Sequence, residues 1–162
     1  MKKLPSNLLI VGLAALGLIV SCFGVEASDL RVAIHGVKSS SGTLMVGLYD
    51  SEEHFRAAIA HAGSLGLVTD RSRLVGIAMR AIAGTQSVVF TELKPGAYAV
   101  ITFHDENDNG KLDENALGLP TEGYGFSNDA EGFFAAPSFK DAAVTLGGHD
   151  KAIAITLKYP RK

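Results

Sequence analysis

The chain has no tryptophan, a single cysteine and no excess of basic residues among its 162 positions. One cysteine cannot form an internal disulfide, and it cannot build a cysteine-rich zinc or iron–sulfur site. Fifteen Lys and Arg against 17 Asp and Glu give a formal net charge of -2. This lacks the basic surplus that binding to a phosphate backbone requires, so we expect no nucleic-acid partner. What is present, 47% hydrophobic and 20% charged residues, is the composition of one globular domain.

The first residues have the pattern of a secretory signal peptide. Lys2 and Lys3 precede an apolar run of 13 residues, Leu8–Val20. A run of this length suits the hydrophobic region of a signal peptide, because spanning a bilayer takes roughly 20 residues. Small residues before position 28 predict cleavage there, which makes residues 1–27 the signal peptide and residues 28–162 the mature domain. We expect export to the periplasm or to the outside of the cell.

A second processing site competes with the first. The segment Ile19–Cys22 resembles a bacterial lipobox, in which case the signal spans residues 1–21 and Cys22 is the site of lipidation. Acyl chains on Cys22 would anchor the protein by about 0.8 kcal/mol per buried methylene, which would make it a membrane-anchored lipoprotein. In the other case Cys22 is removed with the signal peptide. Contact with a membrane is expected only through this anchor.

In the mature chain, apolar residues recur at every second position over short stretches that are bounded by turn residues. This period is typical of β-strands with one buried face. The turn residues at Ser39–Gly42 and at Lys94–Gly96 predict β-hairpins, and Gly147-Gly148 predicts a further turn. The predicted strands cover residues 29–37, 43–50, 73–82, 87–93, 97–104, 142–146 and 152–159.

About seven short strands with regular turns, and no long helical repeat, indicate an all-β fold. We predict a single antiparallel β-sandwich. The strand at residues 43–50 should be packed on both faces or lie at a face of the sandwich, because its odd and even positions are both largely apolar. One helical turn is expected after Asp50, where the Ser51 side chain can accept hydrogen bonds from the backbone.

Acidic residues are concentrated in residues 105–137, which we predict to be a long loop. Eight Asp and Glu and one Lys lie between positions 105 and 131, a local charge of -7. A long loop within a compact domain usually carries a function. Its aromatic residues are predicted to attach the loop to the sandwich rather than to form a ligand-stacking surface. These residues are Tyr124, Phe126, Phe133, Phe134 and Phe139.

The start of this loop follows the first nine positions of an EF-hand calcium loop. Side-chain oxygens stand at positions one, three, five and nine, glycine stands at position six, and a carbonyl is available at position seven. Calcium takes six to eight oxygen ligands, and alternate residues of a tight turn can point their oxygens inward. The predicted metal ligands are Asp105, Asn107, Asn109, the carbonyl of Lys111, and Asp113.

The bidentate glutamate that closes an EF-hand at position twelve is missing, because Ala116 stands there. Glu114, Glu122 or Asp129, or water, would have to complete the coordination. With only two charged ligands at the motif positions, the expected calcium affinity is roughly 10⁻⁴ to 10⁻³ M. The alternative is that the Asn-Gly pair of this loop forms a tight turn and binds no ion.

Catalysis is the less favoured interpretation. His104 ends a predicted strand beside Asp105, and with loop carboxylates it could serve a small periplasmic or surface hydrolase. However, the sequence has no G-x-S-x-G motif, and no histidine adjoins Ser127 or Ser138. We therefore expect a non-catalytic binding or structural module with a calcium-stabilised loop. Its ligand or partner would be another exported or cell-envelope molecule.

Several ordered segments carry a resemblance to a known family. They are Leu93–Val100, Phe103–Asp113, Pro120 with Glu122–Asn128, and Pro137–Ala142. From about Leu30 to Leu157, the chain resembles the exported bacterial family named domain of unknown function 2141 (DUF2141). The resemblance implies an exported β-sandwich of the transthyretin-like or immunoglobulin-like kind, and it brings no established activity. The Pro-Gly-x-Tyr strand is also similar to strands in surface-protein and carboxypeptidase-associated sandwich modules, which implies a binding or accessory role by analogy.

Overall fold

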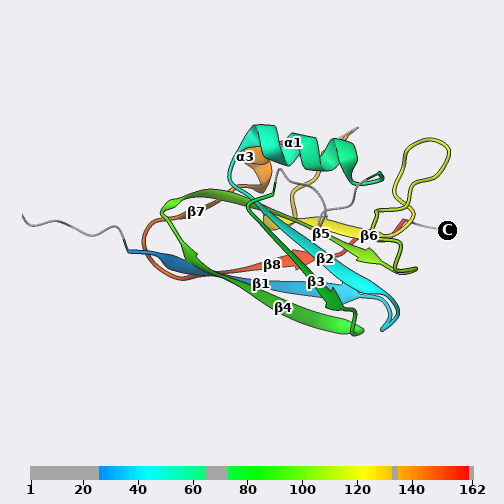
Figure 1. Ribbon diagram of the computed structural model, residues 1–162, viewed down its shortest axis with the longest axis horizontal. Helices are drawn as coiled ribbons and strands as arrows, with labels where there is room; N and C mark the ends of the chain where they lie inside the picture. Colours follow the sequence, from blue (N-terminus) through cyan, green and yellow to red (C-terminus); the bar gives the residue numbers. More distant parts are fainter. Residues whose placement is uncertain (1–25, 65–72, 133–134, 161–162) are drawn as a thin grey trace, which may run out of the picture.

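The structure is a computed structural model (Figure 1). It describes residues 26–64, 73–132 and 135–160. The predicted signal peptide lies almost wholly outside these ranges, as do the predicted lipidation residue Cys22 and the loop residues Phe133 and Phe134. Within the described ranges, no helix has the length and apolar character that crossing a membrane takes.

The described residues form two β-sheets that face each other. Their strands are β1 (Ser28–Val37), β2 (Thr43–Tyr49), β3 (Val75–Arg80), β4 (Gly84–Leu93), β5 (Gly96–Asp105), β6 (Gly123–Phe126), β7 (Val144–Leu146) and β8 (Lys151–Thr156). The first sheet has the order β4-β1-β8, and the second has the order β3-β2-β5-β6, with β7 pairing the start of β5. All neighbouring strands are antiparallel except β1 and β8, which are parallel.

This arrangement confirms the predicted all-β sandwich, with two additions. The parallel pair of β1 and β8 brings the two ends of the described chain into one sheet. Strand β6 was missing from the prediction, because Gly123 and Gly125 leave its four residues without a strong strand pattern. It is nevertheless a strand because it pairs with Ile101–His104 of β5.

The two predicted hairpins are wrong. The turn at residues 39–42 joins β1 in the first sheet to β2 in the second, and the turn at residues 94–96 joins β4 to β5 across the same gap. The turn at Gly147-Gly148 likewise joins β7 to β8 in the opposite sheet. After a tight turn, the next strand can bury its apolar face in two ways. It can pair with the strand before the turn in the same sheet, or it can face that strand from the opposite sheet. Here the chain crosses between the sheets at all three turns.

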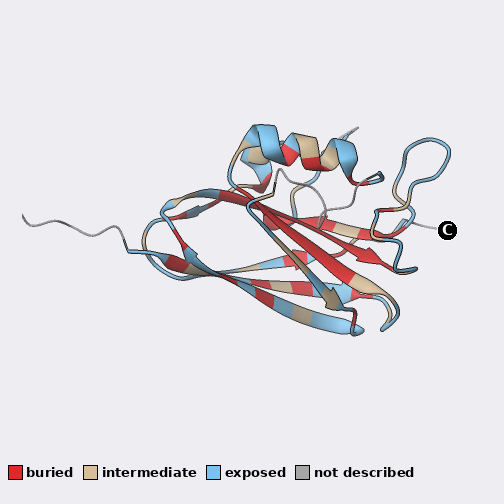
Figure 2. Ribbon diagram, viewed as in Figure 1, coloured by how far each residue is buried: buried red, intermediate tan, exposed pale blue. Residues whose placement is uncertain are grey.

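The main hydrophobic core fills the space between the two sheets. Leu30, Val32 and Ile34 of β1 are fully buried, as the alternation predicted, and Leu44 and Val46 of β2 are buried against the same core. Each such side chain contributes about 1.5–3 kcal/mol through burial. The interleaved buried and exposed residues of β1 and β4 are visible in Figure 2.

A second, smaller core covers the outer face of the second sheet. Here α1 (Glu52–His61) and α3 (Phe139–Ala142) lie across the sheet (Figure 1). The expected cap is present, since Ser51 accepts a hydrogen bond from the His54 N–H at 3.3 Å, but the predicted single turn is a helix of 10 residues. Because this helix covers the outer face, β2 is packed on both faces, which is the first of the two arrangements that its sequence allowed.

Aromatic side chains join the helices and the loop to this face. The ring of Phe55 on α1 contacts Tyr49 on β2, Phe126 on β6 and Phe139 on α3, with ring centroids 5.9–6.1 Å apart. Such tilted and edge-to-face pairs add about 0.5–1.5 kcal/mol each beyond the burial of their area. Phe126 and Phe139 therefore attach the acidic segment to the sandwich, as predicted for the aromatic residues of the loop.

Candidate functional site

The predicted calcium loop begins at the end of β5, where Asp105 ties it to the sheet. The carboxylate of Asp105 belongs to a fully buried residue and accepts the backbone N–H groups of Asn109 at 3.0 Å and of Gly110 at 2.6 Å. Gly110 has a φ of 79°, a left-handed conformation that glycine adopts without strain. Asp105 thus holds the tight turn in place against the sheet.

Three more of the predicted ligands meet in the same turn. The side-chain amides of Asn107 and Asn109 donate to the two carboxylate oxygens of Asp113, each at 2.8 Å. The side-chain oxygens of the two asparagines accept the backbone N–H groups of Asn109 at 3.1 Å and of Lys111 at 2.9 Å. Four predicted ligand side chains and the Lys111 backbone are therefore joined in one hydrogen-bonded unit.

Glu122, one of the three predicted additional ligands, closes the base of this loop. Its residue is only 5% exposed, and its carboxylate accepts the N–H of Glu106 at 2.8 Å and that of Asp113 at 3.0 Å. Burial raises the pKa of Glu122, the two backbone hydrogen bonds oppose that rise, and the charges of Asp113 and Asp105 add to it. Glu122 thus joins the two ends of the loop through its side chain.

The other two additional candidates lie elsewhere. The carboxylate of Asp129 accepts the N–H of Thr156 at 2.6 Å and its hydroxyl at 3.4 Å. The side chain of Glu114 extends toward Gly63, just after α1. A Cβ built on Gly63 would lie 3.1 Å from the carboxyl carbon of Glu114. The structure therefore does not bring Glu114 and Asp129 together with the predicted calcium loop.

The possible metal ligands of the turn are all oxygen atoms, some from charged carboxylates and some from neutral carboxamide and backbone carbonyl groups. Within the part of the chain that the structure describes, no three His, Cys, Asp or Glu side chains are grouped to hold a metal ion. An ion in this turn would therefore depend on carboxamide and backbone oxygens beside the carboxylates of Asp105 and Asp113. Such a set fits a hard cation that takes oxygen ligands, and it does not fit a metal that requires thiolate or imidazole.

His104 faces the interior of the sandwich. It is fully buried, its Nε2 lies 2.7 Å from the carbonyl oxygen of Ser41, and its Nδ1 lies 2.7 Å from the hydroxyl of Tyr159. Because a carbonyl only accepts, Nε2 carries a proton and donates it. In the neutral ring Nδ1 then accepts the Tyr159 hydroxyl proton, while the Tyr159 oxygen accepts the N–H of Lys38 at 3.0 Å. His104 thus connects the C-terminal segment to the turn after β1.

Tyr159→Phe is expected to lower the free energy of unfolding by about 1–3 kcal/mol, because the Lys38 N–H and the His104 ring lose their partner. Burial raises the pKa of Tyr159, against the hydrogen bond from Lys38, and the charges of Glu106 and Glu122 add to the rise. The folded state therefore favours the neutral phenol. The resulting stability is present below the ordinary pKa of 10.0 and is lost as the pH rises through the raised pKa. Urea unfolding on both sides of that pH should show the two proteins converging at high pH, and a constant difference would contradict this role.

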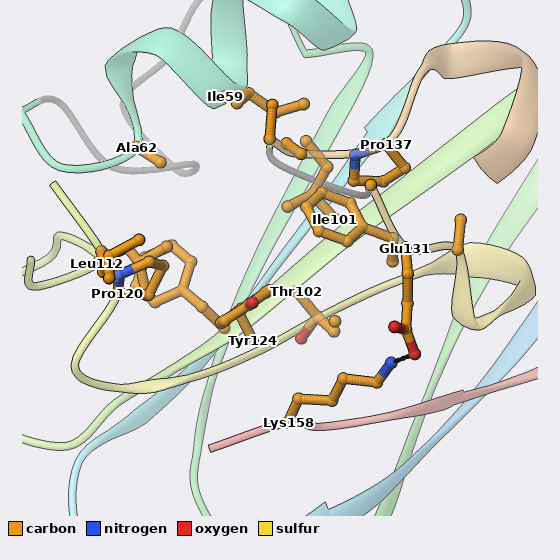
Figure 3. A pocket seen from close by; sticks show the side chains of 18 of the residues that line it. Ile59, Ala62, Ile101, Thr102, Leu112, Pro120, Tyr124, Glu131, Pro137 and Lys158 are labelled. Atoms are coloured by element: carbon orange, nitrogen blue, oxygen red, sulfur yellow. Dashed lines mark hydrogen bonds and ion pairs between the residues drawn. The ribbon is translucent and has the colours of Figure 1, made fainter. Parts of the chain in front are cut away.

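A pocket of about 560 Å³ lies between α1 and the outer face of the second sheet. In Figure 3, Ile59 of α1 lies above Ile101 of β5, and Tyr124 of β6 lies below both. An ion pair joins Glu131 to Lys158. The sequence did not predict this pocket. Its lining comes from α1, β5, the acidic segment and the chain after β8, which no spacing in the sequence brings together.

Fold and site together define a two-sheet β-sandwich with a helical layer over one face and an acidic, hydrogen-bonded turn at the end of a central strand. A sequence model of the family described as "Uncharacterized protein conserved in bacteria (DUF2141)" matches residues 32–154. The chain belongs to this family. A comparison with curated proteins and a comparison with solved structures each found no match.

Proposed function

We propose that this protein is an exported, non-catalytic binding module whose loop at residues 105–113 is stabilised by calcium. The observation that carries the proposal is the turn in which Asn107 and Asn109 both meet the Asp113 carboxylate. The two amide groups donate hydrogen bonds to that carboxylate but leave its negative charge uncompensated, and calcium would supply the missing positive charge. The local charge of -7 between residues 105 and 131 raises the concentration of cations around the loop.

Each residue of the turn has a separate part in this proposal. Asp105 fixes the shape of the turn through its bonds to two backbone N–H groups and would also supply a carboxylate oxygen to the ion. Asn107, Asn109 and Asp113 supply side-chain oxygens, and Lys111 supplies its carbonyl. Water completes the coordination, since Glu122 is held by two backbone N–H groups. These features support weak binding, with a dissociation constant of roughly 10⁻⁴ to 10⁻³ M.

Thermal unfolding of the mature protein in chelator, in millimolar calcium and in millimolar magnesium tests the proposal. Calcium is expected to raise the Tm more than magnesium does, because binding to the folded state contributes RT ln(1 + [Ca]/Kd), about 1.4 kcal/mol at ten times the Kd. Asp113→Asn should lose most of this response, because it removes one of the two charges at the motif positions.

Asp150→Asn is the matched control for this experiment. Asp150 is exposed, accepts the N–H of Asp29 at 2.9 Å and lies outside the loop. The substitution removes the same charge, and the calcium response should remain. A Tm that calcium leaves unchanged in the wild type, or an equal response in Asp113→Asn, would refute the calcium-stabilised loop.

The non-catalytic assignment is supported by the place of His104. Its ring is buried, and both nitrogens are within hydrogen-bond distance of Ser41 and Tyr159, so it offers the hydrolase alternative no exposed base. Export is supported by the basic start and apolar run of the N-terminus. The partner or ligand would then be an exported or cell-envelope molecule, and lipidation at Cys22 would hold the module at a membrane.

A further inference from the structure

The pocket beneath α1 has walls that suit the apolar part of a ligand. Ile101, Leu112 and Phe126 line it and are buried, and Ile59 lines it and is half-buried. Its volume of about 560 Å³ lies within the range of roughly 300–1,000 Å³ typical of sites for small molecules. The pocket is therefore large enough to enclose a hydrophobic chain or ring system.

The charged groups around the pocket are mostly negative. Glu114, Asp129 and Glu131 line it together with one base, Lys158. Asp129 is bound to Thr156 and Glu131 is paired with Lys158, while Glu114 is exposed and has no ion pair among the described residues. The surrounding acidic segment adds to the negative potential, which a low-dielectric hollow concentrates. A positive group is attracted into this field, and a carboxylate is repelled by it.

From the apolar walls and the negative rim we infer that the pocket binds a small amphipathic cation. Its hydrocarbon part lies between α1 and the sheet, against Ile59 and Ile101. Its ammonium group lies near the carboxylate of Glu114, which has no ion pair among the described residues, within the negative potential to which Asp129 and Glu131 contribute. The inference rests on the proposed binding role of the module, and it does not require calcium in the neighbouring loop.

Displacement of a fluorescent apolar probe, N-phenylnaphthylamine, from the mature protein tests this inference. Decylammonium chloride and sodium decanoate carry closely matched alkyl chains with opposite charges, and both are used below the concentrations at which they form micelles. Decylammonium is expected to displace the probe at about one tenth of the concentration that decanoate requires, a difference of ~1.4 kcal/mol. The double variant Glu114→Gln, Glu131→Gln should bring this ratio close to one, because it removes two of the three carboxylates.

Three tryptophan variants place the probe. Ile59→Trp and, separately, Ala136→Trp add bulk to the pocket wall and should abolish saturable probe binding. Ala136 is exposed, so its replacement leaves the core intact. Ile82→Trp adds the same side chain at a position that is 59% exposed and outside the pocket, and it should leave binding unchanged.

Equal displacement by the two amphiphiles, or probe binding that survives both pocket variants, would overturn the inference. Each titration is run in chelator and in calcium, which separates this inference from the proposed loop. Charge-selective displacement in a protein whose Tm does not respond to calcium supports the pocket and refutes the calcium loop. A calcium response without saturable probe binding refutes the pocket alone.

Discussion

Replacing Gly42 with alanine is expected to lower the free energy of unfolding by roughly 2–5 kcal/mol. Gly42 lies in the turn between β1 and β2 and has a φ of 75°. A Cβ at this position would overlap the carbonyl oxygen of Asp105 and lie 2.9 Å from the carbonyl carbons of Asp105 and Glu106. Because these are backbone atoms, the strain can be relieved only by moving the backbone of the turn, of Asp105 and Glu106, or of both. Urea unfolding of the mature protein measures the loss.

Two other glycines separate the causes of this loss. Gly118 has a φ of 73° and nothing within 4 Å of a Cβ, so Gly118→Ala should cost only the roughly 1–2 kcal/mol of a left-handed backbone. Gly147 has neither a positive φ nor a close neighbour, so Gly147→Ala should be neutral or stabilise by about 0.4–1 kcal/mol. If Gly42→Ala costs no more than Gly118→Ala, the close approach of the turn to Asp105 contributes nothing.

Ser127→Ala is expected to cost roughly 2–5 kcal/mol, because it leaves two buried backbone groups without this partner. Strand β7 pairs with the start of β5 and β6 with its end, and neither pairs with Val100 between them. The Ser127 hydroxyl fills this gap. It accepts the Val100 N–H at 2.9 Å and donates to the Ala142 carbonyl at 2.5 Å, and the residue is fully buried.

The measurement is urea unfolding with Ser138→Ala as the matched control. Ser138 caps α3 at the surface, where it accepts the Asp141 N–H at 3.3 Å. Loss of such an exposed cap costs about 1 kcal/mol. Equal losses for the two variants would show that the Ser127 hydroxyl does not replace strand pairing in the gap.

Most of the strands could be predicted from the sequence. A strand with one buried face alternates apolar and polar residues, and this alternation can be recognised within a few neighbouring residues. Leu30, Val32 and Ile34 are an example, and all three are fully buried. The same period does not show which sheet the next strand joins, which is why the predicted hairpins are wrong. Helix α1 extends beyond its predicted turn because Phe55 and Ala58 bury themselves against the outer face of the sheet. That contact depends on tertiary structure and leaves little trace in local sequence.

The candidate sites follow the same division. The residues of the turn from Asp105 to Asp113 are neighbours in the chain, so their spacing alone predicted that they act together. The position of Glu122 depends on how the chain returns to the sheet at β6, and the structure places it at the base of the loop. The pocket beneath α1 combines residues as distant as Ile59 and Lys158. Only the folded chain brings such residues together.

The first sheet places its central strand near one end of the chain and one of its edge strands near the other. Leu30–His35 of β1 pair with Lys151–Thr156 of β8. These bonds cannot form until nearly the whole chain is available. Pairing over such a distance requires a large loss of chain entropy before any contact offsets it, which makes folding slow, on the scale of milliseconds to seconds. A chain of this topology completes its first sheet only after residues 151–156 have been synthesised, so this sheet cannot form on a partly synthesised chain.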